Sequence, residues 1–342
     1  MSRMPRGPIA AALLVLFSGC TPAPASNATT ASPTAATSPA LISSATPIPM
    51  PNSVQLSVAS GNVVWALVAG GRLFRSTDRG DTWQDRSTAL DPLTFSREIA
   101  FISDSEGWQA TSGSPGMACA TQWTGINHTV DGGATWTHLV PAGPPSGADP
   151  SGLFGGPCKH SLSFSDALHG FLSSRDANSA TVIYRTADGG RVWTASGPLP
   201  DPPGFTTRGA GVVLQAGPVR TFGATLLVVA SGEVNGRLVE YAFRSVDAGV
   251  SWIYVATIPE DGAFAFVSAS RWVRMTLPGP SQESTDNGAT WQAFQSDYSQ
   301  AAGVAPVVVF GDPLVGYATV RGSIKRTVDG GAHWTFIHTP GT

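Results

Sequence analysis

Six aspartates stand in the most regular chemical pattern of this sequence. Each follows a Ser or Thr by two positions and precedes a Gly by two and a Trp by five. A carboxylate in this setting can transfer protons, ligate a metal ion, or accept hydrogen bonds from the backbone N–H groups of a turn. The six are Asp78, Asp131, Asp188, Asp247, Asp286 and Asp329.

The other residues of this motif favour its role as a turn. Glycine reaches the positive φ that a tight turn requires, and the aspartate then accepts hydrogen bonds from the N–H groups of the turn. The tryptophan offers a large apolar surface for packing between sheets. We therefore expect all six copies to be structural and assign them no catalytic residue. The tryptophans are Trp83, Trp136, Trp193, Trp252, Trp291 and Trp334.

Histidine and cysteine spacings indicate no metal or cofactor site. The six histidines lack the His-Glu-x-x-His spacing, and no Cys-x-x-Cys is present. Three Gly-Gly pairs belong to the Asp motif and lack the Lys-Ser/Thr of a phosphate-binding loop; they are Gly132-Gly133, Gly189-Gly190 and Gly330-Gly331. The sequence thus predicts neither metal nor cofactor.

A weaker half-motif precedes several copies of the Asp motif and ends in Gly followed by an aromatic residue. Together the two motifs divide each repeat into four short strands. The fourth repeat keeps the β pattern but lacks the half-motif. Clear half-motifs run from Ile102-Ser103-Asp104 to Gly107-Trp108, from Phe164-Ser165-Asp166 to Gly170-Phe171, and from Phe310-Gly311-Asp312 to Gly316-Tyr317.

Successive motif aspartates lie 39 to 59 residues apart, the interval of a four-stranded propeller blade. The sequence therefore predicts an all-β fold, a six-bladed β-propeller of four-stranded antiparallel blades. Seven blades is the alternative, because the fourth repeat is long enough to hide extra strands. The propeller should occupy residues 53–342, with blades near 54–88, 97–140, 160–197, 211–257, 262–296 and 306–340.

The motif resembles the Asp-box (BNR) repeats of sialidases, sortilin-type receptors and photosystem II assembly-factor-like proteins, over residues 54 to 340. The resemblance implies a propeller, but enzymes and pure binding proteins share such repeats. A sialidase would bring an Arg cluster for the sugar carboxylate, a Tyr–Glu nucleophile pair and an acid Asp. The Arg-Ile-Pro signature of those enzymes is absent, and four of the five tyrosines fit blade packing.

The N-terminus is typical of a bacterial lipoprotein signal over residues 1–19. Arg3 and Arg6 precede an apolar run that is too short to span a membrane. The segment Leu-Phe-Ser-Gly-Cys resembles the lipobox, which implies that Cys20 is lipidated; an ordinary cleaved signal is the alternative. Residues 20–52, rich in Thr, Ala, Pro and Ser, should form a disordered tether. We expect an exported protein, anchored by lipid at the outer side of the cytoplasmic membrane or at the outer membrane.

The cysteine count indicates the compartment, and the net charge limits the classes of partner that the protein can bind. With Cys20 lipidated, Cys119 and Cys158 remain as a pair, which predicts one disulfide in an oxidising compartment; two buried thiols are the alternative. The formal net charge of −3 becomes more negative without the signal, and this balance excludes nucleic acid as a partner. We expect a monomer that meets a protein or a glycan at the cell envelope and touches the membrane only through its anchor.

Loop lengths favour one face of the ring for binding. The loops that join the first strand to the second, and the third to the fourth, share one face, which carries the Asp motifs and is called the box face. Longer loops fall on the opposite, loop-rich face, and such loops commonly bind ligands. Phe154 and Phe205 should be either exposed anchors there or caps of the core. The candidate binding residues are Lys159, His160, Arg175, Arg208, Glu233 and Arg237.

These observations favour a non-catalytic binding or assembly-scaffold module, displayed at the envelope, that uses the loop-rich face. A glycoside hydrolase of sialidase-like type is the alternative. The two differ in structure, because an enzyme should concentrate mutually perturbed carboxylates and arginines at the channel mouth. A binding platform should instead expose aromatic or single-sign patches.

Overall fold

The computed structural model describes residues 53–89, 92–116, 119–175, 180–205, 213–259, 262–276, 280–299 and 306–342. The predicted signal, Cys20 and the tether lie outside these ranges, as does Arg208. The regular secondary structure of the described residues consists of β-strands. Within the same ranges, no helix has the length and apolar character needed to cross a membrane.

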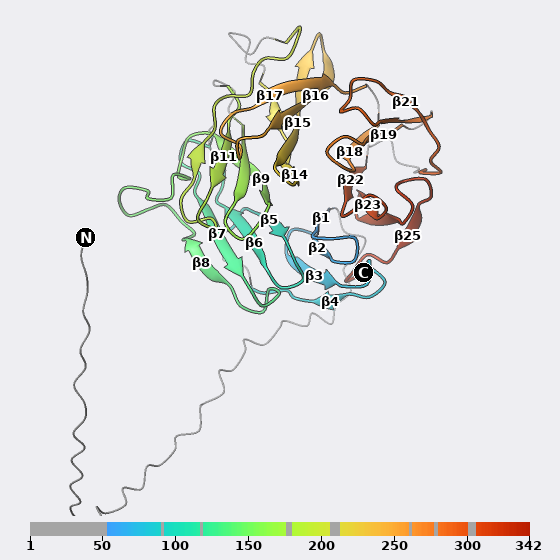
Figure 1. The fold of residues 1–342 in the computed structure, drawn as a ribbon. Helices are drawn as coiled ribbons and strands as arrows, with labels where there is room; N and C mark the ends of the chain where they lie inside the picture. Colours follow the sequence, from blue (N-terminus) through green and yellow to red (C-terminus); the bar gives the residue numbers. More distant parts are fainter. Residues whose placement is uncertain are drawn as a thin grey trace, which may run out of the picture. The chain divides into compact units, whose positions relative to one another are not determined.

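The strands form six antiparallel sheets, here blades 1 to 6 in chain order (Figure 1). Blade 1 holds β1 (Val54–Val58), β2 (Val64–Val68), β3 (Arg72–Ser76) and β4 (Gln84–Asp85). Blade 2 holds β5 (Ser96–Phe101), β6 (Gly107–Ser112), β7 (Thr124–Thr129) and β8 (Thr137–Val140). Blade 3 holds β9 (Cys158–Phe164), β10 (Gly170–Arg175), β11 (Ile183–Thr186) and β12 (Thr194–Ala195).

Blade 4 holds β13 (Gln215–Ala216), β14 (Arg220–Phe222), β15 (Thr225–Val234), β16 (Arg237–Ser245) and β17 (Ile253–Thr257). Blade 5 holds β18 (Ala263–Phe266), β19 (Trp272–Met275), β20 (Ser281–Ser284) and β21 (Gln292–Phe294). Blade 6 holds β22 (Val307–Phe310), β23 (Gly316–Val320), β24 (Ser323–Thr327) and β25 (Thr335–Ile337). The prediction of a six-bladed propeller is confirmed, and the seven-bladed alternative is wrong.

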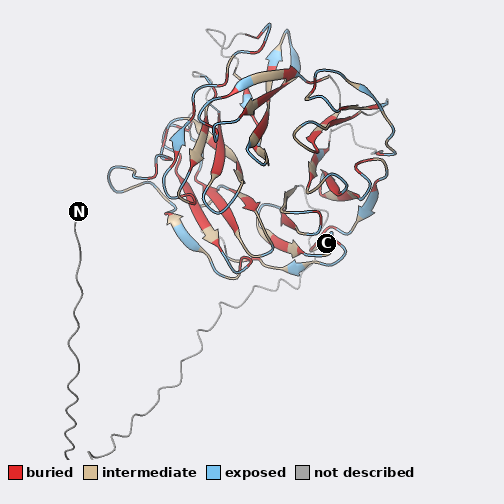
Figure 2. Cartoon of the chain, in the orientation of Figure 1, coloured by how far each residue is buried: buried red, intermediate tan, exposed pale blue. Residues whose placement is uncertain are grey.

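Each blade is one continuous stretch of chain, and the blades form a ring whose inner strands face a central opening (Figure 1). Buried residues gather in the inner and middle strands, whereas exposed ones lie at the rim (Figure 2). All five residues of β2 are buried, because both faces of the sheet pack against neighbouring blades. A continuous apolar run therefore suits this strand better than strict alternation.

Blade 4 departs from the pattern of its neighbours. Its inner strand is split into β13 and β14, which both pair with β15, so this sheet has five strands. The β15–β16 hairpin pairs nine residues on each side, from Leu226 opposite Ser245 to Val234 opposite Arg237. The extra strand anticipated in the fourth repeat thus widens one blade and adds no seventh blade.

The half-motif prediction for blade 2 is shifted by one residue. Phe101, and not Ile102, pairs with Gly107, just as Phe164 pairs with Gly170. The phenyl ring lies where a Cβ on the glycine would be, since such an atom would stand 2.2 Å from the Phe101 ring. Ser103 then accepts the N–H of Glu106 at 2.8 Å and takes the turn-bridging role of an aspartate.

Candidate functional site

The motif aspartates are held entirely within their own turns. In the first copy, Asp78 accepts the hydroxyl hydrogen bonds of Ser76 at 2.7 Å and Thr82 at 2.5 Å, and the N–H of Thr82 at 2.9 Å. The Ser76 hydroxyl in turn accepts the N–H of Gly80 at 2.8 Å. The hydrogen bonds from Thr82, then that from Ser76, lower the pKa of Asp78 to about 2.

The same arrangement recurs around the ring. The Ser251 hydrogen bonds lower the pKa of Asp247 to about 2, and those of Thr290 do the same for Asp286. Burial raises the pKa of Asp329, but the hydrogen bonds from His333 outweigh it and bring the value to about 2. A carboxylate held as an anion by its own turn is a poor proton donor at neutral pH, so these aspartates have a structural role.

Two of the motif tryptophans close their own turns as well as packing between blades. The indole Nε1 of Trp193 donates to Gly190 O at 2.9 Å, and that of Trp334 donates to Gly331 O at 2.8 Å. The Trp193 ring meets Phe164 edge to face with centroids 6.0 Å apart. The tryptophans thus fix the loop positions on the box face.

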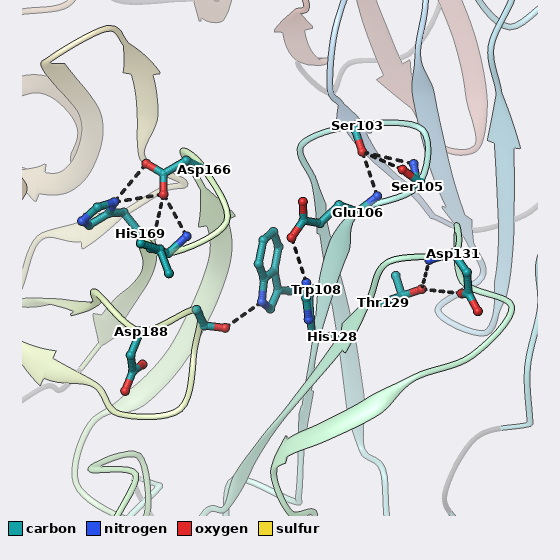
Figure 3. A network of polar contacts seen from close by, with 12 residues as sticks. Ser103, Ser105, Glu106, Trp108, His128, Thr129, Asp131, Asp166, His169 and Asp188 are labelled. Carbon is teal, nitrogen blue, oxygen red and sulfur yellow. Dashed lines mark hydrogen bonds and ion pairs between the residues drawn. The ribbon is translucent and has the colours of Figure 1, made fainter. Parts of the chain in front are cut away.

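Histidine–carboxylate pairs occupy the box face near blades 2 and 3 (Figure 3). His128 Nε2 lies 3.1 Å from Glu106 Oε1, and His169 Nδ1 lies 2.9 Å from Asp166 Oδ1. Between them, the Trp108 indole donates to Gly189 O at 2.8 Å and stacks on Phe164 at 3.7 Å. The two carboxylates therefore bind different histidines on neighbouring blades (Figure 3).

The central opening encloses a cavity of about 1510 Å³, lined mainly by the inner strands of the six blades. Glu98 of β5 accepts the N–H of Leu162 at 2.8 Å, and Asp312 accepts the N–H groups of Leu314 and Val315, each at 2.8 Å. Glu98 and Asp312 are thus bound to backbone N–H groups, whereas two other carboxylates of the lining are bound to side chains, Glu240 to Arg274 and Asp166 to His169.

A disulfide orders the long loops of the loop-rich face. Cys119 and Cys158 are joined, with Cα atoms 5.1 Å apart, and the bond ties the loop between β6 and β7 to the start of β9. Gly155 N–H donates to Gln122 O at 3.0 Å across the same two segments. Asp149 accepts the Phe154 N–H at 2.7 Å, and burial opposes the hydrogen bonds that lower its pKa.

Lys159, which the sequence predicts as a binding residue, lies buried beside the disulfide-linked loops. Its side chain is buried, its Nζ donates to Gly155 O, and it lies 5.2 Å from the Tyr184 ring centroid. Burial lowers the pKa of Lys159 to about 8, partly offset by Asp149. The ammonium group therefore supports the 141–157 connection from inside.

His160 and Arg175 lie at the disulfide end of blade 3. The His160 Nδ1 is 2.9 Å from Ser161 Oγ, and burial lowers the pKa of His160 against the opposing charge of Glu98, with Arg175 adding to the decrease. Ser161 has a φ of 60°, which is strained for a serine, where β9 bulges opposite β10. Arg175, at the end of β10, is exposed.

Glu233 and Arg237 are both exposed near the tip of the β15–β16 hairpin, far in the chain from Lys159. Phe205 is buried at 4% exposure and packs near Tyr241, so it caps the core. Phe154 keeps 39% of its surface exposed. The structure thus brings Lys159, His160 and Arg175 together on blade 3 and leaves Glu233 and Arg237 on blade 4.

The described residues contain no group of three His, Cys, Asp or Glu side chains placed to hold a metal ion. Comparison with other proteins finds the Photosystem II assembly lipoprotein Ycf48 of Synechococcus sp. (strain CC9902), 33% identical over 132 residues. That match covers 38% of this chain and 32% of the relative, so the chain matches about a third of the relative's length. No protein-family model matches the chain.

Solved propellers resemble the whole ring. The Hadza microbial sialidase Hz136 has a TM-score of 0.50 and 15% identity, covering 80% of this chain and 65% of that chain. The chain is an Asp-box β-propeller. A structure of YCF48 bound to D1 peptide is also similar, with a TM-score of 0.46 and 17% identity, covering 82% of this chain and 95% of that chain. The resemblance to sialidase-like and photosystem II assembly-factor-like propellers is confirmed.

This Asp-box propeller exposes apolar side chains on its loop-rich face that the sequence does not predict. Phe95, just before β5, is 67% exposed, and Leu238 in the long hairpin is 69% exposed. The dipeptide Asn235-Gly236, which is typical of a hairpin turn, was the available signal that Leu238 stands near a hairpin tip. Phe95 follows Pro92 by three residues in a connection, and only the folded ring shows that nothing in the described chain covers it.

Proposed function

We propose that this propeller is a non-catalytic binding module that holds a protein partner on its loop-rich face. The observation that carries the proposal is the exposure of Phe95 and Leu238, because large apolar side chains at a loop-bearing surface are common anchors of protein interfaces. Phe154 adds a third, half-exposed aromatic group on the same face.

The hydrogen bonds that the carboxylates accept also favour a non-catalytic role. A retaining or inverting glycosidase needs two carboxyl groups facing one substrate bond. In the described channel, Glu98 and Asp312 are bound to backbone N–H groups, and the motif aspartates are bound in their turns. The glycoside hydrolase alternative rests on fold alone, whereas the partial relative is an assembly protein by name.

We further propose that the partner is met at the cell envelope and that Cys20 carries the lipid anchor. The signal pattern and the uncharged stretch before the propeller support this, and the relative that matches part of the chain is itself a lipoprotein. Mass spectrometry of the membrane-extracted protein should find a diacylated N-terminal Cys20. Release of Cys20→Ser into the soluble fraction is also expected, and an unmodified Cys20 would contradict the anchor.

The binding proposal is tested by photo-crosslinking in cells. A crosslinking residue is placed at Glu233 on the loop-rich face, and at Asp81 on the box face as the control. A protein adduct that forms from position 233 and is absent from position 81 supports the proposal. Equal adducts from both faces, or turnover of a panel of nitrophenyl glycosides by the purified protein, would overturn it.

A further inference from the structure

At one level along the axis of the central channel, Arg220 occupies a position that uncharged residues occupy in the other blades. Strand pairing places it in β14 opposite Leu227, which pairs in turn with the residue just before the Asp motif. The inner strands of the other five blades carry uncharged residues at this level. They are Ser57, Ala100, Ser163, Ala265 and Val309.

The Arg220 side chain reaches across the opening. Its Nη2 donates to the Phe310 carbonyl of blade 6 at 2.6 Å, although Arg220 belongs to blade 4. In Figure 1, β14 lies at the inner edge of the ring and faces the opening. Arg220 lines the cavity and is partly accessible, so its free surface faces the channel.

No carboxylate neutralises this guanidinium among the residues that the structure describes. Burial alone lowers the pKa of Arg220 to about 10, with no opposing contribution from an acidic group. The other charged groups of the described lining are engaged, since Glu240 pairs with Arg274 and His169 pairs with Asp166. A partly buried cation without a counter-charge has lost part of its hydration, and an anionic ligand would offset that loss.

We propose that the channel binds the carboxylate of a ligand through Arg220. A guanidinium presents a planar fork of N–H donors that matches a carboxylate, and one unpaired cation suits a monoanion better than a phosphate dianion. The cavity lining combines aromatic, aliphatic and hydroxyl-bearing residues, among them Phe222, Ser163 and Val309. This site is separate from the loop-rich face and does not depend on the proposed protein partner.

The two sources of such a carboxylate can be separated by titration calorimetry on the full chain. One arm compares glucuronic acid with glucose, and the other compares N-acetyl-trialanine with its C-terminal amide. We expect at least one acid to bind while its uncharged analogue does not, and the acid that binds identifies a sugar or a peptide source. Binding of neither acid above its analogue would overturn the proposal, independently of any variant.

Variants then assign the binding to Arg220. Arg220→Gln removes the charge and should weaken the acid at least tenfold, whereas Arg220→Lys keeps the charge and should retain more of the affinity. Arg191→Gln is the matched control, because Arg191 bonds only within its own turn on the box face. Undiminished binding by both Arg220 variants would place the carboxylate elsewhere and contradict the assignment.

Discussion

Arg326 in blade 6 donates Nη1 to Asp81 Oδ1 of blade 1 at 2.6 Å and to Arg79 O at 2.8 Å. These contacts join the two ends of the propeller chain, and Tyr317 Oη adds a bond of 3.4 Å to Gly61 O. No strand of the described chain is shared between the first and last blades. Closure of the ring thus depends on side-chain packing and on hydrogen bonds such as these, to which Arg72 adds one to Gly341 O at 3.5 Å.

Arg326→Gln should therefore loosen the ring. We expect a loss of about 1 kcal/mol in the free energy of unfolding, because the pair is partly open to solvent. Urea unfolding followed by tryptophan fluorescence measures it. Arg191→Gln, which removes only a bond within one turn, should leave the midpoint nearly unchanged. Equal effects of the two variants would mean that Arg326 has no special role in closure.

Gly107 should tolerate no side chain, because a Cβ would stand 2.2 Å from the Phe101 ring. Gly107→Ala is expected to cost about 1 to 3 kcal/mol through overpacking. Gly147→Ala is the matched control, since nothing lies within 4 Å of the Cβ that it adds. Thermal melting of the two variants decides the point, and similar melting temperatures would contradict the packing of Phe101 on Gly107.

The Cys119–Cys158 bond closes a separation of 39 residues, which in the chain-entropy model contributes roughly 3 to 4 kcal/mol. Dithiothreitol should lower the melting temperature of the wild type to that of the Cys119→Ser, Cys158→Ser double variant. The double variant should not respond to the reductant. If the melting temperature of the wild type does not change after the disulfide has been shown to be reduced, the bond does not stabilise the loops.

The Asp329–His333 pair should make the sixth turn sensitive to pH. The hydrogen bond that His333 Nδ1 donates to Asp329, then the charge of Asp329, raises the pKa of His333 above 6.5. This stabilisation is fully present below the unfolded value near 6.5 and is lost as the pH rises through the folded value. His333→Thr, which copies the Thr290 of the fifth turn, should destabilise the protein more at pH 5.5 than at pH 9. An equal loss of stability at both pH values would contradict a stabilising ion pair between Asp329 and His333.

The repeats, and with them the fold, could be predicted because the Asp motif is a local device. The hydrogen bonds of Asp78 all stay within a few residues of sequence, so spacing alone shows them. The half-motif of blade 2 was misplaced because Ile102 and Phe101 are adjacent and both apolar. Only strand pairing shows that the ring of Phe101 covers Gly107.

The candidate site was less accessible to sequence reasoning because its contacts join distant segments. Lys159 looked like a surface charge, but its burial follows from the way the 141–157 connection folds over blade 3. Phe205 is buried because Gly232, across the long hairpin, leaves room for its ring. Arg220 stands out only once the ring brings Phe310 of blade 6 within its reach.

The central claim, a protein partner bound on the loop-rich face, is tested most directly by an affinity measurement. The partner captured from position 233 would be titrated against the wild type, the Phe95→Asp, Leu238→Asp double variant, and a box-face control. Val130→Asp, Val328→Asp serves as that control, since Val130 is 66% and Val328 is 51% exposed on the box face. The account predicts at least a tenfold loss for the first variant and none for the control. Full affinity of the first variant, or a loss confined to the control, would contradict it.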